Sequence, residues 1–240
     1  MDFVNCYEDA SRADAYASLE FANTYYLAYR DLPAIISEHG AGRRALDFGC
    51  GTGRSSRFLQ KLGFNVIGVD VSEDMLKIAR IVDPSGDYRL VPGDDLSQFD
   101  VETFDLVLSA FTFDNIPAAT KPSILRDLRK LLMPQGIVIN LVSSPEIYLY
   151  EWASFTTKDF PENSAARSGD VVRIIVTDHQ DGRPVEDILC TDDAYQMICR
   201  EAGLKTIQMV KPLAKDDEPY KWINETRIAP WVIYVLKRAV

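Results

Sequence analysis

The chain has 240 residues and a formal net charge of −10, from 26 Lys and Arg against 36 Asp and Glu. Hydrophobic residues make up 47% of it, enough for the core of one α/β domain with insertions. The acidic balance disfavours a large nucleic-acid partner, because it repels a phosphate backbone. No apolar run is long enough to span a membrane, and the acidic N-terminus lacks the charge pattern of a signal peptide, so we expect a cytoplasmic protein without a membrane partner.

Helices and strands alternate through the first half of the chain. Residues 6–38 are rich in helix-forming residues and contain several tyrosines. Strands are then predicted at 44–49, 66–70, 88–91, 104–111 and 136–142, with helices at 53–62, 72–81 and 120–132 between them. Ser72 is a natural N-cap, and the two acids after it suit the positive end of a helix dipole.

Two segments interrupt this alternation before the chain ends in a helix and two strands. Residues 143–190 contain a possible helix with Tyr148, Trp152 and Phe155, and a hairpin of 171–177 against 185–189. A helix capped by Thr191 follows, and the last strands are predicted at 204–210 and 231–237. The connection between these strands, 212–230, is long and polar. The four cysteines, at 6, 50, 190 and 199, are too far apart in the sequence to have the spacing of metal ligands, so we expect no bound metal.

A glycine-rich turn follows the first strand, with Gly49, Gly51 and Gly53 at alternate positions. Glycine lets the backbone approach a ligand closely, because it has no Cβ and tolerates positive φ. Asp70 follows about 20 residues later, at the tip of the next strand, where nucleotide-binding βαβ units hold a ribose hydroxyl pair.

The spacing argues against a dinucleotide. That fingerprint needs a third glycine at position 54, which here is Arg54. The turn is also entered by an acid, Asp47, which would repel a pyrophosphate and attract a cationic ligand.

The pattern Asp47-x-Gly49-x-Gly51-x-Gly53 resembles the first motif of the class I S-adenosylmethionine-dependent methyltransferases. The resemblance covers roughly residues 41–142 and rests on several motifs in the family's order. The others are Gly68-Val69-Asp70-Val71-Ser72, Gly93-Asp94-Asp95-Leu96, Phe104-Asp105-Leu106-Val107 and Leu132-Met133-Pro134-Gln135-Gly136.

The resemblance implies an α/β fold: a Rossmann-like, doubly wound sheet of seven strands, mostly parallel, with an antiparallel last strand. We expect a single methyltransferase domain over 1–240, divided into a helical N-terminal lid (1–40), a cofactor-binding core (41–142 and 191–240) and an α+β cap insertion (143–190). Ligands of such sheets bind beyond the carboxyl ends of the parallel strands. The cap and the 212–230 connection both start at that edge and should rise beside the cofactor.

The family also implies a role for individual residues in binding S-adenosylmethionine and its product S-adenosylhomocysteine. The three glycines should pass along the methionine portion, Asp47 should lie near its ammonium, and Asp70 should accept both ribose hydroxyls. Val71 and Met75 should line the adenine side, and Ser109 should face the cofactor. Asp94 holds the family position for the adenine amino group, with Asp95 and Leu96 beside it; Asp95 replaces a usually small apolar residue, so which acid meets the adenine stays open. Structural roles as turn or cap residues remain alternatives for Asp47, Asp70 and Asp94.

Candidate catalytic residues are Asp114, just past the fourth strand, and His179, in the cap hairpin. Either side chain can accept a proton, and either also fits a solvent-exposed turn. For the acceptor pocket we expect Tyr25, Tyr29, Tyr220 and Trp222, although an amphipathic packing face explains the first two equally well.

The sequence therefore predicts transfer of a methyl group from S-adenosylmethionine to an oxygen or nitrogen atom of a small organic acceptor, by a monomer or homodimer that uses no metal. An RNA or protein methyltransferase, or a non-catalytic module that binds the cofactor, remains an alternative.

Overall fold

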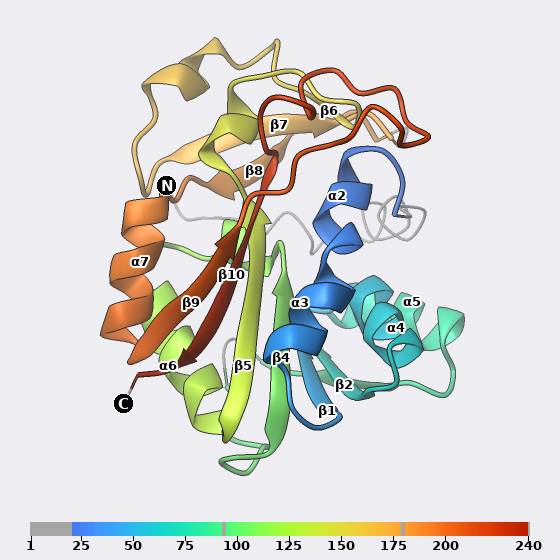
Figure 1. Ribbon diagram of the computed structural model, residues 1–240, viewed down its shortest axis with the longest axis vertical. Coiled ribbons are helices and arrows are strands. Elements are labelled where there is room, and N and C mark those ends of the chain that lie inside the picture. The colour runs from blue at the N-terminus through green and yellow to red at the C-terminus, as the bar shows by residue number, and fades with distance from the viewer. Residues whose placement is uncertain (1–20, 93–94, 179–180, 240) are drawn as a thin grey trace.

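The computed structural model describes residues 21–92, 95–178 and 181–239, and Figure 1 shows a central sheet beneath a smaller one. The central sheet has seven strands in the order β3-β2-β1-β4-β5-β10-β9. Their bounds are β1 Arg44–Phe48, β2 Asn65–Asp70, β3 Asp87–Leu90, β4 Phe104–Ala110, β5 Leu132–Ser143, β9 Leu204–Val210 and β10 Trp231–Arg238. This order confirms the predicted doubly wound, seven-stranded sheet.

The first five strands are parallel, and β10 runs antiparallel between β5 and β9. The carboxyl ends of β1, β2 and β4 therefore meet at one edge of the sheet, where a ligand binds in folds of this kind. Trp231, at the start of β10, pairs with Ser143 at the end of β5 and so lies at that same edge.

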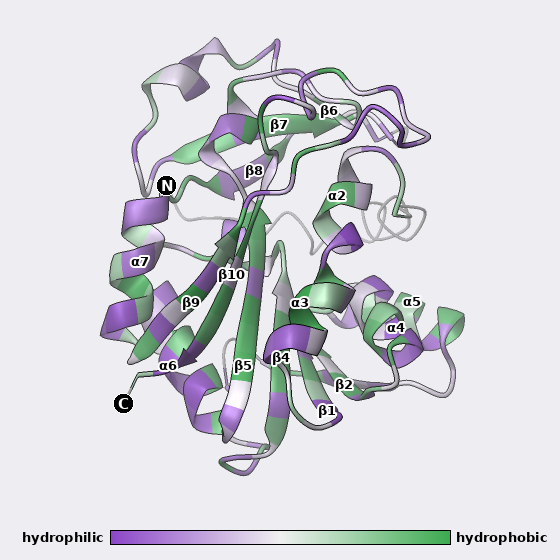
Figure 2. Ribbon diagram, viewed as in Figure 1, coloured by the Kyte–Doolittle hydropathy of each residue, from purple (hydrophilic) through white to green (hydrophobic). Residues whose placement is uncertain are grey.

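Helices cover both faces of the sheet, and their polar sides point away from it (Figure 2). α2 (Thr24–Arg30), α3 (Leu32–His39) and α4 (Arg54–Lys61) share one apolar cluster with the sheet. α6 (Lys121–Leu131) and α7 (Asp192–Glu201) share another, on the opposite face. α5 (Glu73–Val82) packs Leu76 and Ala79 against Tyr88 of β3. Strands covered on both faces carry nearly continuous apolar runs, as β4 and β5 do here.

Two helix starts follow their predicted caps. The Ser72 hydroxyl accepts from the Met75 amide at the start of α5, and the Thr191 hydroxyl accepts from the Ala194 amide at the start of α7. The acidic residues behind each cap lie at the positive end of the helix dipole.

The cap, residues 143–190, forms a three-stranded sheet of β6 (Phe155–Thr156), β7 (Val171–Val176) and β8 (Val185–Ile188). The β7–β8 hairpin was predicted, but the expected helix around Tyr148 to Phe155 is wrong. In the cap residues that the structure describes, the helices are two short 3-10 helices, η3 (Pro145–Tyr148) and η4 (Pro161–Ala165). Trp152 and Phe155 instead close a tight turn through reciprocal backbone hydrogen bonds, and both rings join the apolar cluster of α2 and the sheet.

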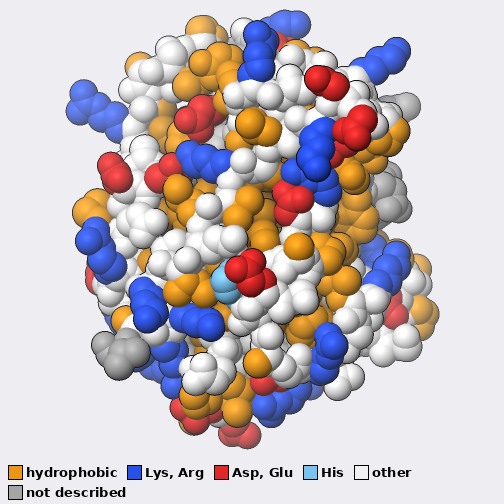
Figure 3. Space-filling view, in the orientation of Figure 1, with side chains coloured by type: hydrophobic (Ala, Val, Ile, Leu, Met, Phe, Trp, Pro, Cys, Tyr) orange, Lys and Arg blue, Asp and Glu red, His pale blue; other side chains and the backbone are white. Residues whose placement is uncertain are grey.

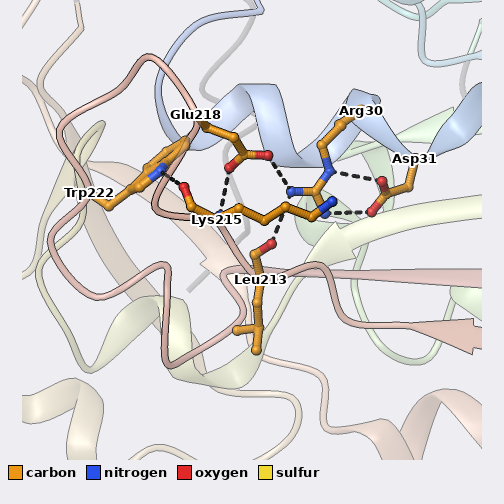
Figure 4. Close-up of polar contacts among 6 residues, drawn as sticks. All are labelled: Arg30, Asp31, Leu213, Lys215, Glu218 and Trp222. Atoms are coloured by element: carbon orange, nitrogen blue, oxygen red, sulfur yellow. Dashed lines mark hydrogen bonds and ion pairs between the residues drawn. The ribbon is translucent and has the colours of Figure 1, made fainter.

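The connection between β9 and β10, residues 211–230, is attached to the end of α2 (Figure 4). The guanidinium of Arg30 donates to the Leu213 carbonyl at 3.0 Å and to Glu218 Oε1 at 2.7 Å. Glu218 also accepts from the Lys215 amide, and the Trp222 indole donates to the Lys215 carbonyl. The connection is therefore folded against α2 by polar contacts.

Glu225 joins three segments at one fully buried carboxylate. Its Oε1 accepts from the Thr24 hydroxyl of α2 at 2.6 Å and from the Ala153 amide of the cap at 2.7 Å. Its Oε2 accepts from the amides of Ile223 and Asn224 in the connection. A buried carboxylate is costly unless it is hydrogen-bonded, and here all four of these partners are donors.

Replacing Glu225 is expected to destabilise the whole molecule. Glu225→Ala leaves four donors without their acceptor, which costs about 3 kcal/mol of unfolding free energy. Glu225→Gln is expected to cost about half of that, because the amide nitrogen faces donors and cannot accept. Urea denaturation measures both, with Glu186→Gln as control, since that side chain is 40% exposed. A Glu225→Ala variant as stable as this control would contradict the assignment.

Candidate functional site

A cavity of about 460 Å³ lies at the carboxyl edge of the parallel strands. It is lined by the turn after β1, the ends of β2 and β4, helix α2 and the cap strands β7 and β8. Cavities of this size hold small molecules and cofactors. A cavity is therefore present at the edge of the sheet where the sequence predicted a site. The central sheet, helix α2 and the cap all contribute to its wall.

The glycine turn after β1 forms one wall. Gly49 and Gly51 have φ values of 73° and 53°, which favour glycine. At Gly49 a Cβ would meet the Thr112 side chain at 2.1 Å, whereas at Gly51 it would meet nothing within 4 Å. The backbone of Gly51 therefore faces open space in the cavity, where a ligand can approach it.

Asp70 lies directly beside this turn and lines the cavity. Its Oδ2 accepts from the Gly51 amide at 2.8 Å and its Oδ1 accepts from the Ser72 amide at 2.9 Å. Burial raises its pKa, and these backbone donors oppose that shift. A carboxylate has about four lone-pair sites, so each oxygen keeps capacity for one further donor, as a pair of ribose hydroxyls requires.

Asp47 is fully buried and does not line the cavity. Its Oδ2 accepts from the hydroxyls of Ser55 and Ser56 at 2.7 and 2.6 Å, so it anchors the first turn of α4. Burial raises its pKa to about 6. Its Oδ1 has no hydrogen-bond partner among the described residues. The contact of Asp47 with the cofactor's ammonium stays a prediction.

The adenine side is only partly as expected. Val71 and Met75 line the cavity, together with Val91. Asp94 lies outside the described residues. The structure places three other expected residues away from the cavity wall: Asp95, Leu96 and Ser109.

Local geometry explains these three positions. Asp95 is exposed and accepts from the Ser97 amide, and Leu96 is buried in the apolar cluster of α6. Ser109 precedes Ala110, which does line the cavity, and successive side chains of a strand point to opposite faces.

Arg54 is the one basic side chain, among the described residues, that lines the cavity. Its guanidinium lies over three aromatic rings of the N-terminal segment, at 5.7 Å from Phe21, 4.8 Å from Tyr25 and 5.6 Å from Tyr29. Cation–π contacts of this kind hold a guanidinium in place. Arg54 therefore presents a fixed positive charge at the glycine-turn end of the cavity.

Four aromatic rings form the wall toward the cap: Tyr25, Phe111, Phe155 and Trp231. Neighbouring centroids are 4.7 to 5.8 Å apart. The Trp231 indole donates to the Thr24 carbonyl at 2.7 Å, which fixes the ring. Phe111 has a φ of 65°, a strained value for a non-glycine residue, and such strain is common where a side chain is held at a functional site.

Of the four aromatic residues expected in the acceptor pocket, the two on α2 line the cavity and the two in the connection do not. Tyr25 and Tyr29 line the cavity as expected, whereas Tyr220 and Trp222 do not. Tyr220 packs at a tilt against Tyr26, with ring centroids 5.1 Å apart, and against Trp222, at 5.2 Å. Tyr26 does not line the cavity either, so these aromatic residues of the connection pack on α2 outside the cavity wall.

Two carboxylates, Asp114 and Asp187, line the cavity, and we call them the carboxylate pair. Asp114 follows β4 in the 3-10 helix η2 (Thr112–Asn115) and accepts from the Ser143 amide at 3.0 Å. Asp187 lies in β8 and accepts from the Tyr148 hydroxyl at 2.9 Å. Burial raises both pKa values, and the charge of Asp187 raises the pKa of Asp114 further.

Lys121 lies behind the carboxylate pair, in the first turn of α6, and is fully buried. Its Nζ has no hydrogen-bond partner among the described residues and lies 5.1 Å from the centre of the Tyr195 ring. Burial lowers its pKa, against the charges of Cys190 and the carboxylate pair. It does not line the cavity.

Sequence reasoning missed Asp187, Arg54 and Trp231 as cavity residues. Strand alternation would have found Asp187, because it shares a strand face with Val185, a core position of the predicted hairpin. His179, the second catalytic candidate, lies outside the described residues. Among residues 21–92, 95–178 and 181–239, no cluster of His, Cys, Asp or Glu is arranged to hold a metal ion. No helix in this described part is both long and apolar enough to span a membrane.

Part of the chain is similar to known proteins. Residues 46–140 match the family model of a methyltransferase domain. A ubiquinone biosynthesis O-methyltransferase of Bordetella avium is 34% identical over 115 residues, which are 45% of this chain and 47% of that protein. A protein of the same name from Hydrogenovibrio crunogenus is 35% identical over 97 residues, 39% of each chain. The chain thus spans about half the length, or less, of these curated relatives.

Solved structures resemble the chain over nearly its full length. The CcbJ methyltransferase from Streptomyces caelestis has a TM-score of 0.67 at 19% identity, over 98% of both chains. A 1,6-didemethyltoxoflavin-N1-methyltransferase from Burkholderia thailandensis, with that compound and S-adenosylhomocysteine bound, has a TM-score of 0.56 at 15% identity, over 89% of this chain and 79% of that one. These structures show that the chain has the Rossmann-like methyltransferase fold.

The carboxylate pair gives the stability of the fold a specific pH dependence. The folded pKa of Asp187 lies above its unfolded value, so the stability that it contributes is present at low pH and is lost as the pH rises through the folded pKa. Asp187→Asn buries no charge, and its Oδ1 can still accept from Tyr148. We expect this variant to gain stability relative to the native chain at pH 8 but not at pH 5, by about 1 kcal/mol.

Scanning fluorimetry at the two pH values measures this difference. Glu186→Gln in the same strand is the matched control and should shift the melting temperature equally at both. A pH-independent effect of Asp187→Asn would show that Asp187 is not a buried acid of raised pKa.

Proposed function

We propose that this chain, whose residues 46–140 match the family model of a methyltransferase domain, transfers a methyl group from S-adenosylmethionine to an oxygen or nitrogen atom of a small organic acceptor. The observation that carries the proposal is Asp70 beside the open backbone of Gly51, on the wall of a cavity at the carboxyl edge of the sheet. The curated relatives are named as O-methyltransferases, which favours oxygen as the methylated atom.

The residues at the glycine-turn end of the cavity fit this cofactor. Asp70 offers acceptors for the ribose hydroxyls, and Met75 and Val91 offer apolar surface for the adenine. Arg54 offers a fixed positive charge for the carboxylate of the methionine portion. The cofactor supplies an activated methyl group when it is bound, and the protein supplies alignment and removal of water.

The rest of the cavity wall suits the acceptor. It carries the rings of Tyr25, Phe111, Phe155 and Trp231, which exclude water, and it also carries Asp114. We retain Asp114 as the candidate that accepts a proton or orients the acceptor. His179 remains a prediction, because it lies outside the described residues.

A macromolecular acceptor is less favoured. Arg54 is the one basic residue of the described cavity wall, and the chain carries a net charge of −10. On the face that Figure 3 shows, Lys and Arg side chains are scattered among acidic and neutral ones. Nucleic-acid partners require clustered basic residues. The other alternative is a module that binds the cofactor without transferring its methyl group. Such a module would form no S-adenosylhomocysteine with any candidate acceptor, and assays with labelled S-adenosylmethionine and a panel of small molecules test for this.

Asp70→Ala is expected to weaken S-adenosylhomocysteine binding about 100-fold, because two charge-assisted hydrogen bonds to the ribose are lost. The Asp70→Asn variant keeps one acceptor oxygen, so its affinity for S-adenosylhomocysteine should lie between those of the native chain and Asp70→Ala. Titration calorimetry measures these affinities. Asp74→Ala is the matched control, since that acid pairs with Lys77 at the surface. Equal affinity in Asp70→Ala and the native chain would refute the proposed cofactor site.

Arg54→Gln is expected to separate two ligands that differ in the amino-acid portion. S-adenosylhomocysteine should bind about tenfold more weakly, because its carboxylate loses a charged partner. 5′-Methylthioadenosine has no carboxylate, so its affinity should not change. If both ligands lose affinity equally, Arg54 acts only by packing on the tyrosines of α2.

A further inference from the structure

The carboxylate pair is built into the cavity wall from two distant parts of the chain. Asp114 comes from the core, just after β4, and Asp187 comes from the cap strand β8. Both residues are at most 6% exposed, yet both line the cavity. A buried carboxylate without a full set of donors is costly, so its presence in an apolar wall requires a reason.

The hydrogen bonds of the pair are incomplete. Asp187 accepts one hydrogen bond, at Oδ2 from Tyr148, and no described donor reaches its Oδ1. Among the described residues, the donors to Asp114 both belong to Ser143, its amide and its side chain. Lys121 contributes a nearby positive charge, but no ion pair joins it to either carboxylate in the described part of the chain. The pair therefore has unused acceptor capacity, and a donor inside the cavity is the group that would complete it.

The surroundings of the pair define the rest of the ligand. Trp231 and Phe155 lie on the aromatic wall, and Ile174, Val176 and Val185 line the cavity from the cap strands. These surfaces suit a flat, apolar, ring-sized body with one polar end. Negative charge at that end would be repelled by two carboxylates in a medium of low dielectric.

We propose that Asp187, supported by Asp114, holds the hydroxyl or amino group of the acceptor and takes its proton, and that the same pair rejects acceptors bearing an anion at this end. This inference rests on the proposed methyl transfer. The acceptor's oxygen or nitrogen forms a bond to the methyl carbon as the carbon–sulfur bond breaks, and that electron pair stays on sulfur. The acceptor's proton moves to Asp187 and leaves with the product to solvent.

Two observations support Asp187 as the residue that takes the proton. Burial raises its pKa toward neutrality, which makes it a stronger base than an exposed aspartate, and Tyr148 fixes its orientation. Its cap strand also carries Val185 on the same face, so the carboxylate points to where the acceptor's body lies.

Three ring compounds of one size test the inference: phenol, benzylamine and benzoate. Each is titrated into the full chain saturated with S-adenosylhomocysteine, with calorimetry as the readout. Phenol and benzylamine should bind with dissociation constants on the order of 1 mM, as fragments of this size do. Benzoate should bind at least tenfold more weakly, because its charge is repelled by the pair.

Asp187→Asn is the decisive variant. The affinities for phenol and benzylamine should fall about tenfold, since hydrogen bonds to a charged acceptor are stronger than those to a neutral one. The affinity for benzoate should then lie within about threefold of theirs, because one repelling charge has been removed. S-adenosylhomocysteine binding should not change, which also shows that the variant is folded. The native Glu186 side chain contacts Arg173 outside the cavity. Glu186→Gln removes one charge from the same strand, and it should change neither the affinities for the ring compounds nor that for S-adenosylhomocysteine.

The outcomes separate the two proposals. If S-adenosylhomocysteine does not bind the native chain, the proposed function fails. If it binds, three outcomes would each overturn the inference. The first is benzoate binding as tightly as phenol, and the second is no binding of phenol or benzylamine at roughly 10 mM, ten times the expected dissociation constant. The third is an Asp187→Asn variant that binds phenol, benzylamine and benzoate with the affinities of the native chain.

Discussion

The hydrogen bond from the Gly51 amide to Asp70, 2.8 Å long, holds together the two strand ends on which the site depends. It ties the turn after β1 to the end of β2, and the amides of Gly49 and Cys50 reinforce it by donating to the Val69 carbonyl. The strand edge thus becomes a rigid floor, on which an open backbone segment and a carboxylate are presented together. Helix α2, the cap strands β7 and β8 and the start of β10 contribute side chains to the cavity beside this floor.

Two kinds of surface meet in the cavity above this floor. Beside the glycine turn, Arg54 is combined with Asp70, a pairing that suits a ligand with both charges. The aromatic rings and the carboxylate pair form the second kind, which suits a neutral or cationic ring compound, and the two kinds adjoin where the Arg54 guanidinium lies over Tyr25. Because the polar groups are held by backbone donors, by Tyr148 or by aromatic packing, little reorganisation is needed when ligands bind.

Local patterns in the sequence predicted the strands of the central sheet and the caps at Ser72 and Thr191, because these depend on periodicity and neighbouring residues. The resemblance to the family implied that the strands form one doubly wound sheet. The cap was harder. Trp152 and Phe155 look like one face of a helix, and only their tertiary burial favours a turn. Tyr220 was expected in the cavity because the polar residues around it offer little to bury its ring, whereas the structure packs it against Tyr26 of α2. Contacts between distant segments decide such positions.

Glu225 has a consequence for the mobility of the cavity wall. One buried carboxylate binds α2, the cap and the connection, and the first two of these segments also line the cavity through Tyr25 and Phe155. Neither segment can move away from the other without breaking hydrogen bonds to Glu225. A change in the shape of this part of the wall therefore requires α2 and the cap to be displaced together, or this junction to be broken.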